Sequence, residues 1–417
     1  MARHAEPITA RQHIASFLVA SLVISIICGP AMIAASELED AIKTANQGGG
    51  TTELVLKSNV QLTAPLPALE GAAVLTITGA CAVNRCVISG NNAFPIFTSP
   101  SSGPTGGILN LRNLTFQDAA GGVFVNVRTR INATQCGFVN NKGPSNGGGV
   151  LSESYSVTKS VSLRYFSLCI FYNNTTPTGG GGALSINSGY PQGQGPALTI
   201  TGSYFRNNSA PKGQGGVIRV EGTGKVVFKS CLFDGNSAAY TCLAAFVSLS
   251  LFLSGPCTLT PSFPRGPFRP TIQPSASFHP ALSTLSTLST LPSMHPGGAG
   301  GAIYSNGTSL TFNKAIFRDN KAIGVPSIST CGFGGAVFAN LGRYSETSVR
   351  FCASSFTGNT GCQGTYDTVF LQMVPGPTSP DFPSTVMYCN GTAKPAGLLA
   401  PASGWQELSS CTSSTCD

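Results

Sequence analysis

A Phe that recurs with an Asn three residues after it is the feature that most constrains how this chain folds. Aligned on the Phe, seven segments have mostly apolar residues seven and five positions before it and modest-sized residues two positions before it. The Phe positions are Phe116, Phe138, Phe171, Phe205, Phe233, Phe317 and Phe356, and the Asn positions are Asn141, Asn174, Asn208, Asn236, Asn320 and Asn359. A spacing of two places side chains on one face of a strand. The odd step between the two pairs of positions indicates a bend, so each segment predicts two short strands joined at a corner.

Gly-Gly pairs follow most of these segments and lead into further apolar residues, as in Gly215-Gly216-Val217-Ile218. Gly permits sharp turns and close approach of backbones, so the pair predicts the start of a third strand. Short strands with recurrent side chains at matching positions stack as successive coils. The sequence therefore predicts an all-β, right-handed parallel β-helix, a solenoid with a file of interior Phe rings and a ladder of Asn amides. Arg164 departs from the apolar column, and Leu163 stands beside it.

The alternation of Phe-x-x-Asn with Gly-Gly-Ala-Ile resembles the repeat of the chlamydial polymorphic outer-membrane protein family. Phe317 and Asn320, with the preceding residues 300–303, carry one copy of both motifs. Similar repeats occur in proteins of eukaryotic algae and protists. The resemblance runs from about Leu109 to Asn359, and the sequence before it is similar to the start of a pectin-lyase-like β-helix. It implies a parallel β-helix presented outside the cell, often with an adhesive role.

The N-terminus predicts export. Arg3 and Arg11 precede an uncharged apolar stretch, residues 14–27, and small residues follow it. This order is typical of a secretory signal peptide, here residues 1–35, and an uncleaved signal anchor is the alternative. Both alternatives place the rest of the chain outside the cytosol, so we expect a protein that is secreted or held at the cell surface.

Cysteines and glycosylation sequons indicate the same compartment. The chain has 14 Cys, which fits an oxidising environment. Cys81 and Cys86 flank a short polar loop, so we expect a local disulfide between them. Cys136 and Cys169 are expected to stack inward as small core residues. The candidate N-glycosylation sites are Asn113, Asn132, Asn173, Asn174, Asn207, Asn306 and Asn390.

The remaining boundaries follow from where the repeat starts, breaks and fades. Residues 36–108 are expected to form an N-terminal cap and the first coils, with a short helix over residues 36–45. Repeats occupy residues 109–239 and 297–362. Between them, residues 240–296 are rich in Pro, Ser and Thr, which predicts a disordered insertion. Residues 363–417 are expected to form a Cys-containing C-terminal cap or tail.

Few residues in the repeats suit catalysis or metal binding. Charged residues make up only 10% of the chain, and the net charge of +8 is spread without a basic run, which argues against nucleic-acid binding. All four His lie in the leader or the insertion, and we expect no metal and no cofactor. Asp234 and Asp319 are the only repeat carboxylates expected to reach the separation that glycoside hydrolysis needs. Asp234 would also stand between Arg206 and Arg318 on neighbouring coils, which a surface ion ladder explains without catalysis.

The function that the sequence favours is the display of a rigid, glycosylated surface for adhesion, with extracellular glycans or surface proteins as partners. The first alternative is a polysaccharide-active lyase or hydrolase of pectin-lyase-like fold, with Asp234 and Asp319 as its catalytic candidates. The second is a structural wall component. Contact with a membrane is expected only if the N-terminal segment remains as an anchor.

Overall fold

The structure is a computed structural model that describes part of the chain. The described residues are 32–33, 35–47, 50–70, 74–99, 107–126, 129–154, 163–187, 197–222, 224–239, 299–324, 332–341, 347–361, 368–373, 384–389, 392 and 405–408. They belong to one compact unit, which comprises residues 1–241 and 297–417. Most of the predicted signal peptide and all of the predicted insertion, residues 240–296, lie outside the described residues. Within the ranges given above, no helix is long and apolar enough to cross a membrane.

The described residues contain one helix, α2 (Ser36–Gln47), and four sheets in which every strand pair is parallel. Sheet A contains β1 (Met32–Ile33), β3 (Asn59–Gln61), β5 (Cys86–Ser89), β8 (Leu114–Gln117), β11 (Gly137–Val139), β14 (Ile170–Tyr172), β17 (Tyr204–Arg206), β21 (Leu232–Asp234), β25 (Ile316–Arg318) and β29 (Ser355–Thr357). Sheet B contains β2 (Thr51–Leu56), β4 (Val74–Gly79), β7 (Ile108–Arg112), β10 (Arg130–Thr134), β13 (Arg164–Ser167), β16 (Ala197–Thr201), β20 (Lys225–Lys229), β24 (Ser309–Asn313), β28 (Ser348–Cys352), β31 (Ser384–Cys389) and β32 (Trp405–Leu408). Sheet C contains β6 (Phe97–Thr98), β9 (Phe124–Val125), β12 (Leu151–Ser154), β15 (Leu184–Asn187), β19 (Ile218–Glu221), β23 (Ile303–Asn306), β27 (Val337–Leu341) and β30 (Val369–Met373), and sheet D contains β18 (Ser209–Ala210), β22 (Ser237–Ala239) and β26 (Lys321–Ile323).

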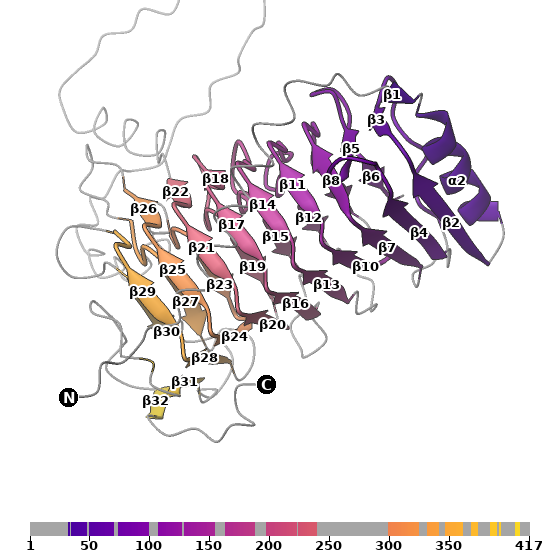
Figure 1. The fold of residues 1–417 in the computed structure, drawn as a ribbon. Coiled ribbons are helices and arrows are strands. Elements are labelled where there is room, and N and C mark those ends of the chain that lie inside the picture. Colours follow the sequence, from indigo (N-terminus) through magenta and orange to yellow (C-terminus); the bar gives the residue numbers. More distant parts are fainter. Residues whose placement is uncertain are drawn as a thin grey trace, which may run out of the picture. The chain divides into compact units, whose positions relative to one another are not determined.

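Neighbouring strands in each sheet are equivalent strands of successive coils. For example, β13, β14 and β15 of one coil pair with β16, β17 and β19 of the next. Figure 1 shows this order as strands of successive sequence colours that lie side by side. A chain that returns to the same three sheets, one coil later and in parallel, is a parallel β-helix, so the predicted all-β fold is confirmed.

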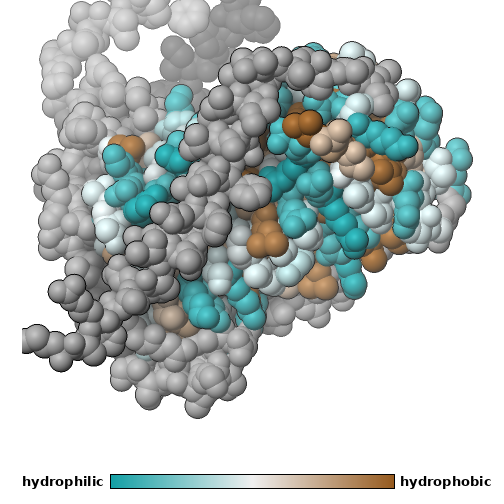
Figure 2. Space-filling model, in the orientation of Figure 1, coloured by the Kyte–Doolittle hydropathy of each residue, from teal (hydrophilic) through white to brown (hydrophobic). Residues whose placement is uncertain are grey.

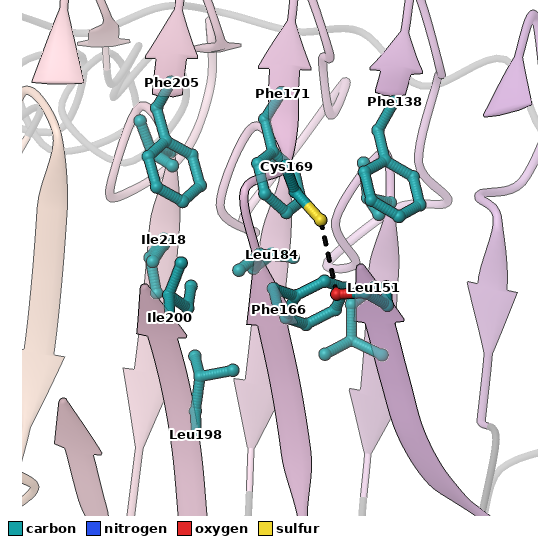
Figure 3. Packing of buried hydrophobic residues seen from close by; sticks show 14 of the residues in the cluster. Phe138, Leu151, Phe166, Cys169, Phe171, Leu184, Leu198, Ile200, Phe205 and Ile218 are labelled. Carbon is teal, nitrogen blue, oxygen red and sulfur yellow. Dashed lines mark hydrogen bonds between the residues drawn. The ribbon is translucent and has the colours of Figure 1, made fainter. Parts of the chain in front are cut away.

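The central Phe rings form an interior file, as the column alignment predicts. Phe138, Phe171 and Phe205 are register partners and fully buried, and Figure 3 shows them on consecutive strands. The ring centroids of Phe171 and Phe205 are 4.5 Å apart, and those of Phe205 and Phe233 are 4.8 Å apart. Stacked rings at such distances attract each other beyond the effect of buried area. Phe356, on the last strand of sheet A, is only partly buried.

Left-handed backbone conformations form the corners on both sides of the sheet A strands. Three residues before the Phe, Asn113 and Leu168 both have φ 54°. Two residues after the Phe, Asn140 has φ 56° and Asn207 has φ 54°. Asn tolerates this region better than most residues, whereas Leu168 adopts it at a steric cost. The recurrence of Asn at these corners therefore reflects the backbone as well as the side chain.

The Asn three residues after each Phe forms the predicted amide ladder. Asn174 Nδ2 donates to Asn208 Oδ1 in the next coil (2.9 Å) and to the carbonyl oxygen of Phe138 in the previous coil (3.0 Å). Asn208 Oδ1 also accepts the backbone N–H of Asn174 at 3.1 Å. The same bonds continue through Asn236 and Asn320, and the Asn residues of the ladder are buried. Each amide thus satisfies buried backbone groups that would cost about 1–3 kcal/mol if unpaired.

Close backbone contacts explain the Gly-Gly pairs. Gly215 has φ +72°, and a Cβ on Gly216 would lie 2.1 Å from the carbonyl oxygen of Gly301. A Cβ on Gly301 would in turn lie 2.0 Å from the carbonyl oxygen of Gly335. Successive coils therefore approach each other here by backbone alone, and only Gly fits this position without a shift of the chain.

The helix predicted over residues 36–45 is present as α2, which extends to Gln47. Leu38, Ile42 and Ala45 are buried on one face of α2 and join the interior core. Lys43 and Glu39 form an exposed ion pair at 2.7 Å on its surface. In Figure 1, α2 lies beside β2, at the N-terminal edge of sheet B. It thereby covers core residues at the N-terminal end of the coils.

The stack is continuous across the predicted insertion and extends past the predicted end of the repeats. Before the insertion, β19 and β21 pair directly with β23 and β25, which follow it. Beyond residue 362, β30 extends sheet C, and β31 and β32 extend sheet B. Cys352 and Cys389 are register partners on β28 and β31, and each belongs to a disulfide. Part of the predicted C-terminal cap is therefore a further stretch of the stack that no Phe-x-x-Asn motif marks.

The predicted disulfide between Cys81 and Cys86 is confirmed, with Cα atoms 5.3 Å apart. We expect replacement of both by Ser to lower the free energy of unfolding by less than about 3 kcal/mol, the value for a 15-residue loop, because the entropic effect grows with loop length. Denaturant unfolding of C81S/C86S and wild type measures the difference. A loss of 4 kcal/mol or more, as roughly expected for a 100-residue loop, would contradict this account.

Candidate functional site

Two rows of side chains lie on the outward face of sheet A, beside the buried Phe file. We call them the sheet A strip. One row precedes the Phe by one residue and the other follows it by one residue, so they alternate with buried positions. The first row contains Ile170, Tyr204, Leu232 and Ile316, and the second contains Tyr172, Arg206, Asp234 and Arg318. All eight are exposed or half-buried except Asp234, whose side chain is only 9% exposed.

The strip brings aliphatic, aromatic and charged groups together in register. Ile316 is 45% exposed, and the side chains of Arg206 and Arg318 are 47% and 49% exposed. On the face that Figure 2 presents, hydrophobic residues form small separate groups between hydrophilic ones. The described surface in view thus mixes apolar and polar residues without one broad apolar patch.

Asp234 is the centre of a polar cluster in the strip. Arg318 donates from Nε to Asp234 Oδ1 (2.9 Å) and from Nη2 to Oδ2 (2.8 Å). Tyr204 Oη donates to Asp234 Oδ2 at 2.9 Å, and Arg206 Nε lies 3.7 Å from the same oxygen. The paired bonds from Arg318 have the bidentate form that holds a carboxylate most firmly. The carboxylate is therefore fixed by partners from the coils before and after it.

These partners set the protonation of the cluster. Burial acts to raise the pKa of Asp234, but hydrogen bonds from Arg318 and Tyr204 and the charges of Arg318 and Arg206 outweigh it and lower the pKa. Burial, and then the hydrogen bond to Asp234, raises the pKa of Tyr204 to about 12. Asp234 is therefore an anion and Tyr204 a neutral donor at neutral pH.

Asp319 and Asp234 both contact the guanidinium of Arg318. The side chain of Asp319 is 60% exposed, and its Oδ2 lies 3.9 Å from Arg318 Nε. The predicted ladder of Arg206, Asp234 and Arg318 agrees with the observed ion pairs. The contribution of Tyr204 was not predicted. The alignment does place Tyr204 at an outward position on the coil before Asp234, in the row next to that of Asp234.

Most of the candidate glycosylation sites in the described residues are accessible. Asn173 and Asn207 are exposed at sheet A corners, and Asn113 and Asn132 are half-buried. Asn173 Nδ2 donates to an Asn side chain one coil away at 2.8 Å, so an outer amide contact accompanies the buried ladder there. Asn390 lies outside the described residues.

Two of the sequons are buried, and these candidates are corrected. Asn174 is fully buried, with its amide bonded to Asn208 and Phe138. Asn306 is 5% exposed on β23. A sequon is a three-residue pattern and says nothing about burial, whereas the Phe-x-x-Asn frame already assigns Asn174 to the interior. A glycan on either residue is incompatible with the observed packing.

An ion pair inside the coil was missed by the sequence reasoning. Arg164 occupies the apolar column, in register with Ile131, while Leu163 is 42% exposed. Arg164 Nε donates to Glu153 Oε1 at 2.6 Å, Nη2 also contacts that oxygen, and Nη1 donates to the carbonyl oxygen of Leu163 at 3.2 Å. Both charged side chains are 0% exposed. Arg164 is therefore an interior residue, because Glu153 on β12 supplies its counter-charge.

Metal-ligating groups are sparse among the described residues. In these residues, no group of three or more His, Cys, Asp or Glu is placed to hold a metal ion. The four His lie outside the described ranges.

The chain matches no protein-family model, no curated protein and no solved structure. The parallel β-helix is therefore assigned from the strand order and register of the structure itself.

Proposed function

We propose that this protein is a non-enzymatic binding protein of the cell exterior, secreted or held at the cell surface, that presents the sheet A strip to an extended glycan or surface protein. The observation that carries the proposal is the strip itself. In one of its rows Tyr204 is aligned with exposed Ile316, and in the other Tyr172 is aligned with exposed Arg206 and Arg318. Coils repeat about every 4.8 Å. A surface with such a repeat suits a partner that is itself extended and repetitive.

The charges of the strip favour an anionic partner. Two guanidiniums flank a single carboxylate, and about half of each Arg side chain is accessible. Guanidinium groups bind carboxylate and sulfate groups in paired hydrogen bonds, and Tyr rings supply flat apolar contact area. The resemblance to the polymorphic outer-membrane protein repeats, which we propose as the family, agrees with an adhesive role.

The alternative of a polysaccharide lyase or hydrolase has little support at the aspartates. A glycosidase needs one carboxylic acid that is protonated at the working pH and a second carboxylate. The pKa of Asp234 is lowered, and Asp319 contacts the same Arg318. Asp234 is therefore ionised at neutral pH and is a poor candidate for the acid of such a pair.

The test is glycan-array binding of the full-length secreted protein, with a parallel assay for cleavage of polygalacturonate. We expect binding to anionic glycans without loss of polymer, and at least tenfold weaker binding for R206Q/R318Q. The charge-matched control is R130Q/K225Q, which alters exposed residues of sheet B and should bind within twofold of wild type. Cleavage of the polymer, or equal binding by both double variants, would refute the proposal.

A further inference from the structure

Two buried thiols lie on successive coils at the bend before sheet A. Cys136 and Cys169 immediately precede β11 and β14, whose residues Gly137 and Ile170 are register partners. Both side chains are at most 1% exposed. Together with Cys231 they are the free cysteines in the part of the chain that the structure describes.

The two thiols interact, and their pKa values shift in opposite directions. A hydrogen bond from Cys169 lowers the pKa of Cys136 against the effect of burial, whereas burial raises the pKa of Cys169 well above its usual value. Cys169 Sγ also lies 3.5 Å from the carbonyl oxygen of Ala133, a bond drawn in Figure 3. Stacked strands lie about 4.8 Å apart, within the roughly 4.4–6.8 Å that separates the Cα atoms of disulfides. Because the residues that follow them are register partners, the Cα separation expected for Cys136 and Cys169 falls within the range of disulfides.

We propose that Cys136 and Cys169 form a disulfide that links these two coils. The oxidant is a small disulfide such as oxidised glutathione. During folding, before the coils enclose Cys136, its thiolate attacks one sulfur of the small disulfide and releases a thiolate, which takes up a proton to become the first free thiol. Cys169 then loses its proton and attacks the sulfur of Cys136 in the mixed disulfide, which releases the second thiol. Two cysteine thiols are oxidised, one small disulfide is reduced to two thiols, and the two cysteine protons end on those thiols.

Other cysteines of the β-helix are already oxidised. Cys86 holds the same column position on an earlier coil, and its partner Cys81 lies in the short loop that precedes it. Cys352 and Cys389 are register partners on adjacent coils, and both belong to disulfides. Cysteines at stacked positions are therefore compatible with oxidation in this β-helix.

Cys231 provides an internal control. Ser203 lies between Cys169 and Cys231 in the column, and its Oγ accepts the backbone N–H of Cys169 at 3.1 Å. Two coil steps amount to about 9.6 Å, which exceeds the reach of a disulfide. Cys231 is therefore expected to stay free of Cys169.

A link from residue 136 to residue 169 encloses Glu153 and Arg164. It closes a longer loop than the Cys81–Cys86 disulfide does, so it restricts the unfolded chain more. It also ties together the coils that bury the Arg164–Glu153 ion pair. The proposed disulfide thus links the two coils at the point where charged Arg164 replaces an apolar residue of the column.

The experiment maps the disulfides of the full-length protein after refolding in reduced and oxidised glutathione. Free thiols are alkylated in denaturant, N-glycans are released, and tryptic peptides are identified by mass spectrometry. Cleavage after Arg130 and Lys142, and after Arg164 and Arg206, places Cys136 and Cys169 in separate peptides with no other cysteine. We expect these peptides to be linked, with Cys81 linked to Cys86 in the same sample.

Variants and alternative outcomes keep the test decisive. In C136S and in C169S, the remaining partner should become alkylated, while in C231S the link should persist. Circular dichroism checks that each variant folds. If Cys136 and Cys169 were both alkylated in wild-type protein that had formed the Cys81–Cys86 bond, the proposal would be overturned. A link from either residue to Cys231, or a stable mixed disulfide with glutathione, would overturn it equally.

Discussion

Replacing Arg164 with Met is expected to lower the free energy of unfolding by about 3–5 kcal/mol. Arg164 and Glu153 are both 0% exposed, and the guanidinium binds Glu153 Oε1 through Nε and Nη2. Met at this position leaves the Glu153 carboxylate in the interior without that guanidinium. An ionised group that is buried and has lost its counter-charge is among the largest known sources of destabilisation. Urea unfolding, followed by circular dichroism, measures the change.

The double variant E153L/R164M separates the cost of an unpaired charge from the value of the pair. Hydrophobic residues of similar volume often replace a buried ion pair without loss, so we expect the double variant to be more stable than R164M. Arg130 lies on the neighbouring strand β10 and is exposed, so R130M is the matched control and should stay within about 0.5 kcal/mol of wild type. If R164M were no less stable than R130M, the interior ion pair would make no measurable contribution to the free energy of unfolding.

The repeated parts of this fold were predictable because the same residue types recur at the same positions in successive coils. The Phe file and the Asn ladder recur at fixed spacing, so Phe205 and Asn208 could be assigned to the interior from their neighbours in the alignment. The helix α2 was predictable for a local reason, since apolar Leu38 and Ile42 lie one turn apart. Local spacing and repetition were sufficient wherever every coil uses the same residue type.

Contacts that occur once in the stack were not predictable in the same way. The pairing of Arg164 with Glu153 depends on two inward positions on different sheets, and no other pair of charged side chains among the described residues is fully buried. The strands β30, β31 and β32 continue the stack without a Phe-x-x-Asn motif, because backbone pairing does not require that side chain. In the candidate site, the Arg206–Asp234–Arg318 ladder followed from the alignment, whereas the bond from Tyr204 required the outward geometry of β17.

Replacing Phe205 with Ala is expected to cost about 3–5 kcal/mol of unfolding free energy. Phe205 is fully buried, and its ring is stacked between Phe171 at 4.5 Å and Phe233 at 4.8 Å. Truncation removes the buried area of the ring and both stacking contacts. Cavity cost depends on how far the surroundings collapse, and here backbone pairing on both sides holds the neighbouring coils at a fixed distance.

The matched control for this prediction is Phe356, which has the same place in its repeat but lies on the last strand of sheet A and is only partly buried. Phe356 stacks on one ring of the file, Phe317, at 5.0 Å, with an edge-to-face contact to Phe351 at 5.5 Å. F356A should therefore lose less stability than F205A when both are measured by urea unfolding. Equal losses would mean that the coils do not gain stability from neighbours on both sides. A loss from F205A below that from F356A would contradict the assignment of the Phe file as the energetic centre of the stack, since each coil of a solenoid is stabilised by its interfaces with the coils before and after it.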